Sequence, residues 1–327
     1  MEQDTILSEA LVLLRRAGVR ISGGNLDSLS LTLPDHSQVI VRVHPADAPP
    51  PAARLRSLLE RPERMLVVSP RGGKAVIEAA SDDRMDLITI DPASVVIAGR
   101  QRLEEDSKDR NDRVHGHGRA PWGRWAMERA LVLSPVPMQQ QHLADSAAIS
   151  QPAVAKHLKN LTHWVRRVQG GWEVRDRRSL LLQWLQDYPG PRGASTYWYS
   201  LDPPSDQARK AASYAAFMGA EPLVSGDMAA DVYAPWRLPD NVQIYVRQAV
   251  DLTDAGFTPA ARDEATLTLT IPQDPTLWAT ADSSEHSGDL PLADPLVVLQ
   301  DLSRGDAVDS PDAVAHFLEF ISREGSR

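Results

Sequence analysis

The chain of 327 residues contains no cysteine. It therefore has no disulfide, no thiolate nucleophile and no cysteine-based zinc site. It also lacks any run of 18 apolar residues, so we expect no transmembrane helix and no membrane partner. The first residues, MEQDTILSEALVLLRRAG, carry acids and no cleavage-like site, which favours a cytoplasmic protein over a secreted one.

Positive charge is scarce: the chain has 35 Lys and Arg but 44 Asp and Glu, which gives a net charge of −9. The charges are unevenly distributed. Residues 121–188 hold nine Lys/Arg and five Asp/Glu, a local +4, whereas residues 239–327 hold five and sixteen, a local −11. Where charge lies matters more than its total for an anionic partner. We expect such a partner at the middle segment, and a basic protein partner at the acidic end.

Length and composition predict two or three domains of an α/β (α+β) multidomain protein. Helical and strand periodicities alternate in the first part, where the apolar run Arg64–Ser69 predicts a buried strand of a mixed sheet. A segment rich in both charges follows and predicts a solvated linker. The expected divisions are an N-terminal α/β domain (1–99), a linker (100–120), a central domain (121–188) and a C-terminal α/β domain (189–327).

The central domain begins with two predicted helices, residues 122–133 and 139–146. Ser134-Pro135-Val136-Pro137 ends the first helix, because proline cannot donate a helical hydrogen bond. A short turn at Ala148-Ile149 leads to a third helix, residues 150–161. Ser150 is its expected N-cap, and Pro152 falls in its first turn, where a missing N–H costs little.

The third helix carries two different faces. Val154, Leu158 and Leu161 recur at helical spacing and predict a buried face. Polar and cationic residues remain on the other face, and a predicted hairpin follows, with Gly170-Gly171 as its two-residue turn. Amides and cations of this kind suit base edges and phosphates. The predicted DNA contacts are Gln139, Ser150, Gln151, Pro152, Ala153, Lys156, His157, Lys159, Asn160, Arg166, Arg167, Gln169 and Arg175.

These motifs carry a resemblance to known regulators. Leu143-Ala144, ISQPAV from Ile149 and Lys156-His157-Leu158 resemble the winged helix-turn-helix of ArsR- and MarR-type bacterial transcription regulators. The resemblance covers about 65 residues and implies that residues 150–161 enter the major groove of DNA. Two other interpretations stay open: the winged helix serves as a protein–protein module, or Lys156, Lys159 and His157 form an ordinary solvated face.

The flanking segments carry further resemblances. The run LVVSPRGGKAVIEAA resembles a restriction-endonuclease-like domain that accompanies winged helices, but residues 1–99 lack the acid-x-Lys triplet that binds metal. Val224-Ser225-Gly226-Asp227 resembles the helix-opening turn of the AbiEi-type antitoxin-like regulators, which look like degenerate nucleotidyltransferases. The next strand has Gln243 and Tyr245 where a working transferase has carboxylates. We therefore expect neither enzymatic activity nor a catalytic residue, metal or cofactor.

Two short motifs are rejected as sites. SPRGGK, ending at Lys74, lacks the spacing of a phosphate-binding loop, and His115-Gly-His117 in the linker has no third ligand. The sequence thus predicts a sequence-specific DNA-binding transcription regulator, a repressor, located in the cytoplasm with the nucleoid. A two-fold operator favours a homodimer. The alternative function is the antitoxin of a toxin–antitoxin pair that also represses its own operon.

Overall fold

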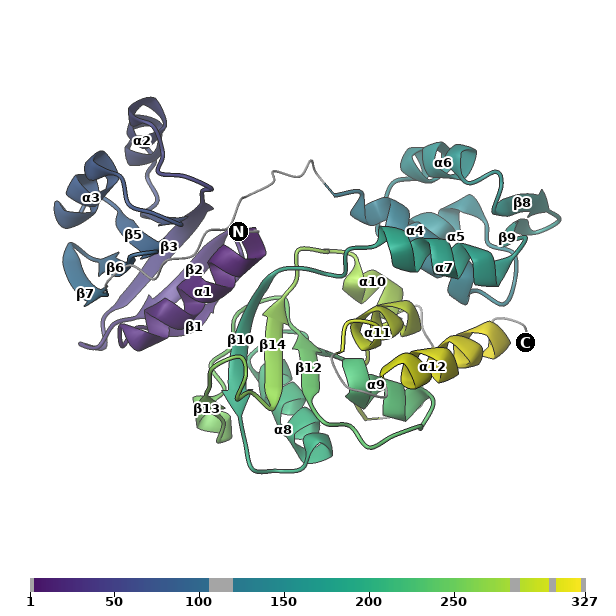
Figure 1. Cartoon of the computed structure of the whole chain (residues 1–327). Helices are drawn as coiled ribbons and strands as arrows, with labels where there is room; N and C mark the ends of the chain where they lie inside the picture. The colour runs from purple at the N-terminus through teal and green to yellow at the C-terminus, as the bar shows by residue number, and fades with distance from the viewer. Residues whose placement is uncertain (1–2, 106–119, 283–288, 306–309, 325–327) are drawn as a thin grey trace.

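The computed structural model describes residues 3–105, 120–282, 289–305 and 310–324 of the chain. His115 and His117 lie outside these ranges. The elements form three groups, which we call the N-terminal unit (residues 3–105), the central unit (121–188) and the C-terminal unit (189–324) (Figure 1). Sheets and helices are mixed along the chain, which confirms the expected α/β class.

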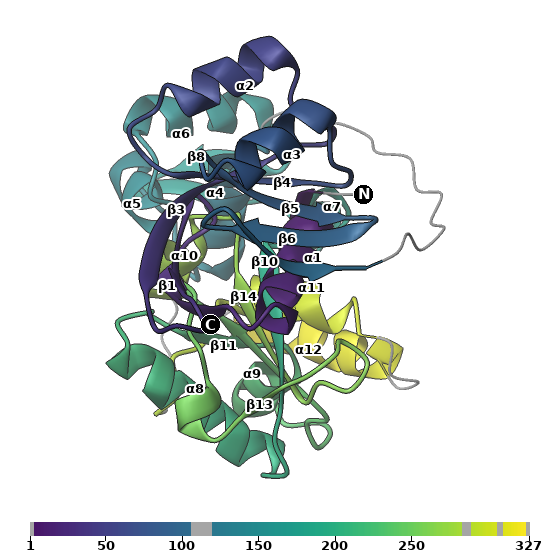
Figure 2. The ribbon, with the colours of Figure 1, turned by 90° about the vertical axis from the view of Figure 1, so that its left-hand side faces the viewer.

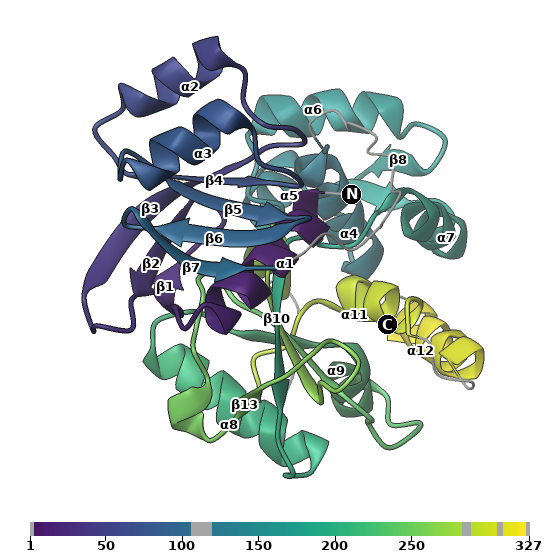
Figure 3. The same ribbon diagram turned by 60° about the vertical axis from the view of Figure 1, so that its left-hand side comes forward.

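The N-terminal unit is a seven-stranded sheet whose strands follow chain order, from β1 to β7. β3, β4 and β5 are parallel, and the other pairs are antiparallel. Helix α1 packs on one face, and α2 and α3 cover the other (Figure 3). The bounds are α1 Gln3–Arg16, β1 Arg20–Gly24, β2 Ser28–Thr32, β3 Gln38–Pro45, α2 Ala52–Leu59, β4 Met65–Ser69, α3 Lys74–Ser81, β5 Asp86–Ile90, β6 Ala93–Ile97 and β7 Arg100–Glu104.

The buried strand of this unit was predicted from the sequence, whereas two less buried strands were not. Every residue of β4 is buried, as expected of an apolar strand covered on both faces. The expected linker is wrong at its start, because residues 100–104 form the edge strand β7. β7 is at most half-buried, and its mostly polar composition resembles that of a loop. The short first strand, β1, was not predicted.

The central unit contains the expected helices, followed by a hairpin and a fourth helix. Its elements are α4 Trp122–Leu133, α5 Gln140–Ser146, α6 Gln151–Asn160, β8 Val165–Val168, β9 Gly171–Val174 and α7 Arg177–Asp187. A separate hydrophobic cluster joins α4, α5 and α6. Asp176 caps α7 as its oxygen accepts a hydrogen bond from the Ser179 N–H at 3.0 Å.

The C-terminal unit is built on a five-stranded sheet in the order β11-β12-β14-β10-β13. Strand β10, which was not predicted, lies inside this sheet. Helix α8 packs on β11 and β12. The bounds are β10 Ala194–Tyr199, α8 Pro204–Phe217, β11 Leu223–Ser225, α9 Gly226–Tyr233, β12 Val242–Tyr245, β13 Thr258–Pro259, β14 Leu267–Ile271, α10 Leu277–Asp282, α11 Pro295–Leu302 and α12 Ser310–Glu324, with a 3-10 turn at Thr253–Ala255.

Helix α1 joins the N-terminal and C-terminal units. It contacts β10 as well as its own sheet, so the two units share one hydrophobic core (Figure 2). The Arg15 guanidinium lies 4.1 Å from the Trp198 ring centre. The Ser8 hydroxyl accepts a hydrogen bond from the Ser195 N–H at 2.9 Å. The position of the N-terminal unit is therefore set by packing of folded elements against the C-terminal unit.

A buried arginine joins the central unit to the C-terminal unit. Arg129 of α4 is fully buried, and its Nη1 lies 3.1 Å from Asp274 Oδ2, while its Nε lies 3.1 Å from Asp294 Oδ2. Thr276 and Thr280 accept further bonds from Nη2 at 2.9 and 3.1 Å. Burial lowers the pKa of Arg129, but the charges of Asp294 and Asp274 outweigh it and raise that pKa. We call these five residues the arginine clamp.

The arginine clamp makes a first prediction. Arg129→Met should lower the free energy of unfolding by about 3–5 kcal/mol, because it leaves Asp274 and Asp294 buried without their cation. The measurement is urea unfolding, with the exposed Arg178→Met of α7 as a matched control.

Adding Asp274→Asn and Asp294→Asn to Arg129→Met should recover part of the lost unfolding free energy, because both buried negative charges are then removed. Asparagine, like aspartate, can still accept the N-cap hydrogen bonds of a helix. If Arg129→Met costs no more than Arg178→Met, the clamp does not hold the units together. If Arg129→Met is insoluble, solubility of the triple variant supports the clamp, and its insolubility contradicts it.

Candidate nucleic-acid interface

Helix α6 lies on top of α4 and α5, at the outer side of the central unit (Figure 1). Val154 and Leu158 are fully buried beneath it, and Leu161 is buried just past its end, which confirms the predicted apolar face. Pro152 occupies the first turn. The Ser150 hydroxyl makes no capping hydrogen bond, so the expected N-cap bond is wrong, although Ser150 has the extended backbone of an N-cap. Packing therefore positions α6.

The opposite face of α6 is open to solvent. Gln151, Lys156, Lys159 and Asn160 are all exposed. Among the described residues, no carboxylate lies within ion-pair distance of either lysine. Two exposed ammonium groups three residues apart can neutralise neighbouring phosphates of a duplex backbone.

Two predicted contacts on α6 are engaged by the protein itself. The Gln151 side-chain amide donates to the Gln141 side chain of α5, and Gln141 in turn donates to Asp145 at 2.8 Å. His157 is half-buried, and burial together with the charges of Lys156 and Arg124 lowers its pKa. His157 is therefore mostly neutral at pH 7. Ala153 is likewise only partly exposed, and Pro152 is exposed.

The hairpin β8–β9 lies beside α6 and forms part of a small three-stranded arrangement. Met138, just before α5, exchanges two backbone hydrogen bonds of 2.8 Å with Trp172 of β9. The two-residue turn is Gln169-Gly170, one residue earlier than predicted, because Val168 pairs with Gly171. At Gly171 the backbone has φ +149°, and a Cβ there would collide with the Met138 carbonyl group. Gly171 therefore serves the close approach of Met138 to the hairpin.

Some cationic side chains of the hairpin are bonded within the protein, whereas others are exposed to solvent. Arg166 is paired through its Nε with Glu173 Oε1 at 2.6 Å, and the Arg175 Nε donates to the Val165 carbonyl at 3.2 Å. Arg167 and Gln169 are exposed. Gln139, predicted as a contact on the second helix, is exposed at the N-cap of α5. These three residues are open to solvent, whereas Arg166 must leave Glu173 to meet a ligand.

A second group of charged side chains includes Arg124 and Glu128 of α4 and Asp187 of α7. The Glu128 side chain is almost fully buried, and its Oε1 lies 3.0 Å from Arg124 Nε, while Arg124 Nη2 reaches Asp187 at 2.6 Å. Burial raises the pKa of Glu128 to about 7, and the charge of Arg124 only partly opposes this. The charge of Arg124 also lowers the pKa of His157 on α6.

The turn that resembles a transferase site is present but occupied by hydrogen bonds within the protein. Gly226 has φ +60° and opens α9 directly after β11. The Ser225 hydroxyl donates to Asp301 at 2.6 Å, and the Tyr245 hydroxyl donates to the same carboxylate at 2.9 Å. Burial raises the pKa of Asp301 to about 6. Among the residues that the structure describes, no three His, Asp or Glu side chains come together as a metal site.

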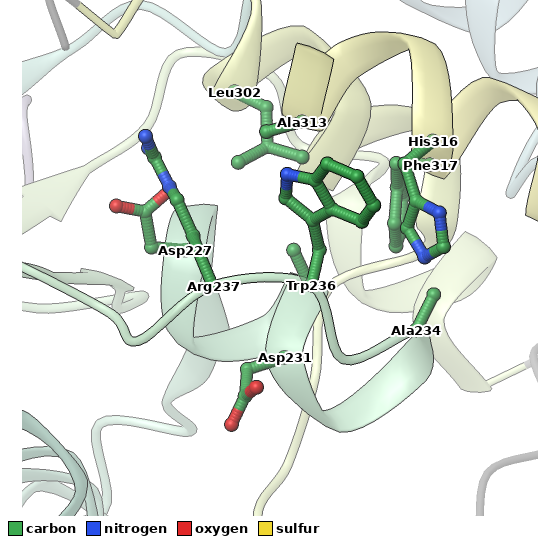
Figure 4. A pocket seen from close by; sticks show the side chains of 10 residues that line it. Asp227, Asp231, Ala234, Trp236, Arg237, Leu302, Ala313, His316 and Phe317 are labelled. Atoms are coloured by element: carbon green, nitrogen blue, oxygen red, sulfur yellow. The ribbon is translucent and has the colours of Figure 1, made fainter. Parts of the chain in front are cut away.

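The C-terminal unit also has a small open pocket between α9 and α12 (Figure 4). Trp236 is 56% exposed and stacks on His316 with ring centres 4.8 Å apart. Asp231 lines the pocket, and Arg237 pairs with Asp227 at 2.9 Å on its other side. The exposed indole can contact a cationic side chain, whereas the Asp231 carboxylate points away from the ring (Figure 4).

Comparison with models of protein families, with curated proteins and with solved structures finds no match for this chain. No helix in the described ranges combines the length and apolar character needed to cross a membrane.

The sequence interpretation missed several residues of this region. Arg129 and Glu128 lie inside the apolar repeat of α4, and a charged pair on a buried face was the available signal. On α7, Leu182 is 41% exposed, while Leu180 and Trp184 are buried. Gln141 carried no signal, because its role depends on how α5 and α6 are placed.

The raised pKa of Glu128 makes a second prediction. In the folded protein this pKa is about 7, against an ordinary value of 4.5, so the folded state holds the proton more tightly. The contribution of Glu128 to the free energy of unfolding is therefore fully present below pH 4.5 and is lost as the pH rises through 7. Between pH 5 and pH 8 the wild type should lose about 1–3 kcal/mol of unfolding free energy relative to Glu128→Gln.

Urea unfolding at four pH values measures this difference, with the exposed Glu78→Gln as control. Parallel pH profiles for the wild type and Glu128→Gln would show that the Glu128 pKa is not raised by folding.

Proposed function

We propose that the chain is a sequence-specific regulator of transcription that binds double-stranded DNA and acts as a repressor. The observation that carries the proposal is the orientation of α6. Its apolar side is fully buried on α4 and α5, and its polar, cationic side faces solvent at the outer edge of the molecule (Figure 1). A helix with these two faces suits the major groove of B-DNA, which is wide enough to admit it.

The contacts divide into two kinds. Lys156, Lys159 and Arg167 serve the backbone, because a cation gains from any phosphate and reads no sequence. Gln151 and Asn160 serve base edges, because an amide presents a donor and an acceptor together. Gln151 must first exchange its bond with Gln141, so α5 restricts the side-chain conformations that reach DNA.

The charge distribution supports specific over indiscriminate binding. The central unit carries +4 within a chain of −9. Backbone phosphates attract the central unit and repel the acidic C-terminal unit, which favours one orientation of the protein on a duplex. The proposal includes association with the nucleoid and two copies on a two-fold operator.

We further propose that the chain is neither a nuclease nor a nucleotidyltransferase. β12 presents Gln243 and Tyr245 where two carboxylates would be needed to bind magnesium. In the N-terminal unit Asp86 is buried and accepts two bonds of 2.7 Å from Arg64, so its carboxylate is already neutralised. Metal-dependent cleavage or nucleotide transfer by the pure protein would overturn this.

The face of α6 makes a third prediction. Lys156→Ala with Lys159→Ala should reduce the slope of log affinity against log salt by about two, because two phosphate contacts are lost. The measurement is fluorescence anisotropy of a bound duplex at several salt concentrations.

The matched control is Arg209→Ala with Lys210→Ala on α8, which removes the same charge far along the chain. An unchanged slope for the α6 variant, or an equal loss for the α8 variant, would mean that α6 does not meet the backbone.

A second function, the antitoxin of a toxin–antitoxin pair, is favoured by the acidic C-terminal unit with its exposed Trp236. In this proposal a basic segment of the toxin docks in the pocket of Figure 4. The cation meets the Trp236 ring, and Asp231 lines the same pocket.

The fourth prediction tests this docking by co-expression with the protein encoded beside this gene. If that protein is toxic, the chain should restore growth, and Asp231→Ala with Trp236→Ala should lose the rescue while keeping DNA affinity. Leu201→Ala with Asp263→Ala, both exposed elsewhere, should rescue normally. Rescue by the pocket variant would exclude the pocket, and absence of toxicity would exclude the antitoxin.

A further inference from the structure

The N-terminal unit contains a second basic segment that the proposed function does not use. Residues 42–74 hold seven Lys/Arg and three Asp/Glu, a local charge of +4. The central unit carries the same +4, so the remainder of the chain carries −17 within the total of −9. Two cationic segments thus stand out from a strongly acidic protein.

Helix α2 and the turn after it carry three of these seven cations. Leu55 and Leu58 anchor it to the sheet, with exposures of 6% and 1%. Arg54 and Arg56 lie on the two flanks of its outer side and are exposed, and Arg61 follows just after the helix. Among the described residues, no carboxylate is within ion-pair distance of these three arginines. By contrast, Arg64 is held by Asp86 and Asp83.

Two of these arginines, Arg54 and Arg61, act on one histidine of the sheet. His44 of β3 is half-buried, and burial together with the charges of Arg54 and Arg61 lowers its pKa. Both guanidinium groups are therefore close to the same imidazole. Asp47, Glu60 and Glu63 are the acids of this segment, and all three are exposed. We call the three exposed arginines without carboxylate partners among the described residues the α2 patch: Arg54, Arg56 and Arg61.

Helices α2 and α6 lie at the same end of the molecule. Figure 1 shows α2 above the N-terminal sheet and α6 above α4 and α5, both at the top. The turned views of Figures 2 and 3 keep α2 and α6 at this end. The shared core along α1 and the arginine clamp fix this arrangement, so neither surface depends on a flexible connection.

We propose that the α2 patch is a second binding site for the phosphate backbone of DNA, engaged by the same duplex that α6 reads. Arginine suits this role, because its planar guanidinium donates paired hydrogen bonds to phosphate oxygens. A duplex that extends past the groove occupied by α6, along the top of the molecule, meets the patch on one flank. The patch reads no bases and adds affinity and orientation. This inference rests on the proposed function.

The experiment compares two duplexes that carry a sequence bound by the wild type. The short duplex covers only the core sequence, and the long duplex extends it by about 15 base pairs on each side, roughly one and a half helical turns. The salt slope of the wild type should be steeper on the long duplex by about 2 to 3, since each phosphate contact contributes about 0.9.

Arg54→Ala with Arg56→Ala and Arg61→Ala should remove this difference and leave the short-duplex affinity unchanged. The corresponding lysine variant should keep most of it, because lysine retains the charge. Arg100→Ala with Arg262→Ala, exposed on β7 and in the C-terminal unit, is the control and should behave as the wild type. Thermal unfolding verifies that each variant is folded.

A hydroxyl-radical footprint gives an independent measure. The wild type should protect backbone on one flank beyond the core, and the α2 variant should lose that flank only. Equal slopes on both duplexes, or an intact flank in the α2 variant, would show that the patch is an ordinary solvated surface while binding by α6 stands. If the wild type binds neither duplex, the proposed function and this inference both fail.

Discussion

The arginine clamp is the constraint on which the rest of the arrangement depends. Arg129, Asp274 and Asp294 are all fully buried, and removing three ions from water is costly unless each finds its partners. The threonine hydroxyls and Tyr188, whose hydroxyl donates to Asp274 at 2.7 Å, add hydrogen bonds to these ions. A buried polar network tolerates only one geometry. It therefore fixes α4, and through α4 the direction in which α6 faces.

A fixed orientation matters because the charges of the protein are divided by sign. Helices α2 and α6, which carry exposed cations, lie at one end of the molecule (Figure 1). The acidic residues are concentrated in residues 239–327. If the central unit could turn freely, its cations would meet the carboxylates of the C-terminal unit and lose their availability to a ligand. The clamp and the shared core along α1 prevent this rotation. The pocket beside Trp236 lies in the acidic C-terminal unit.

The predictable parts of the structure are those governed by local periodicity. Val154 and Leu158 recur at helical spacing, and the buried side of α6 follows directly. β4 is apolar throughout and was located to within one residue. β7 was missed because an edge strand of polar residues looks like a linker, and β10 because its aromatic cluster has flanking prolines and glycines.

The candidate site was predictable in outline but not in its internal bonding. The exposed positions of Lys156 and Lys159 follow from the helix period. The bond between Gln151 and Gln141 and the pairing of Arg166 with Glu173 do not, because they depend on how neighbouring elements approach. Arg129 illustrates the same limit: its partners lie more than 140 residues away along the chain.

Selection of bound duplexes from a pool with a randomised centre tests the central claim most directly. If α6 reads base edges from its fixed position, repeated selection by the full chain should enrich one sequence motif. The variant Gln151→Ala should then lose preference at one position of that motif while binding the remaining positions. Enrichment of no motif, or of a motif unaffected by every substitution on the outer face of α6, would contradict the account.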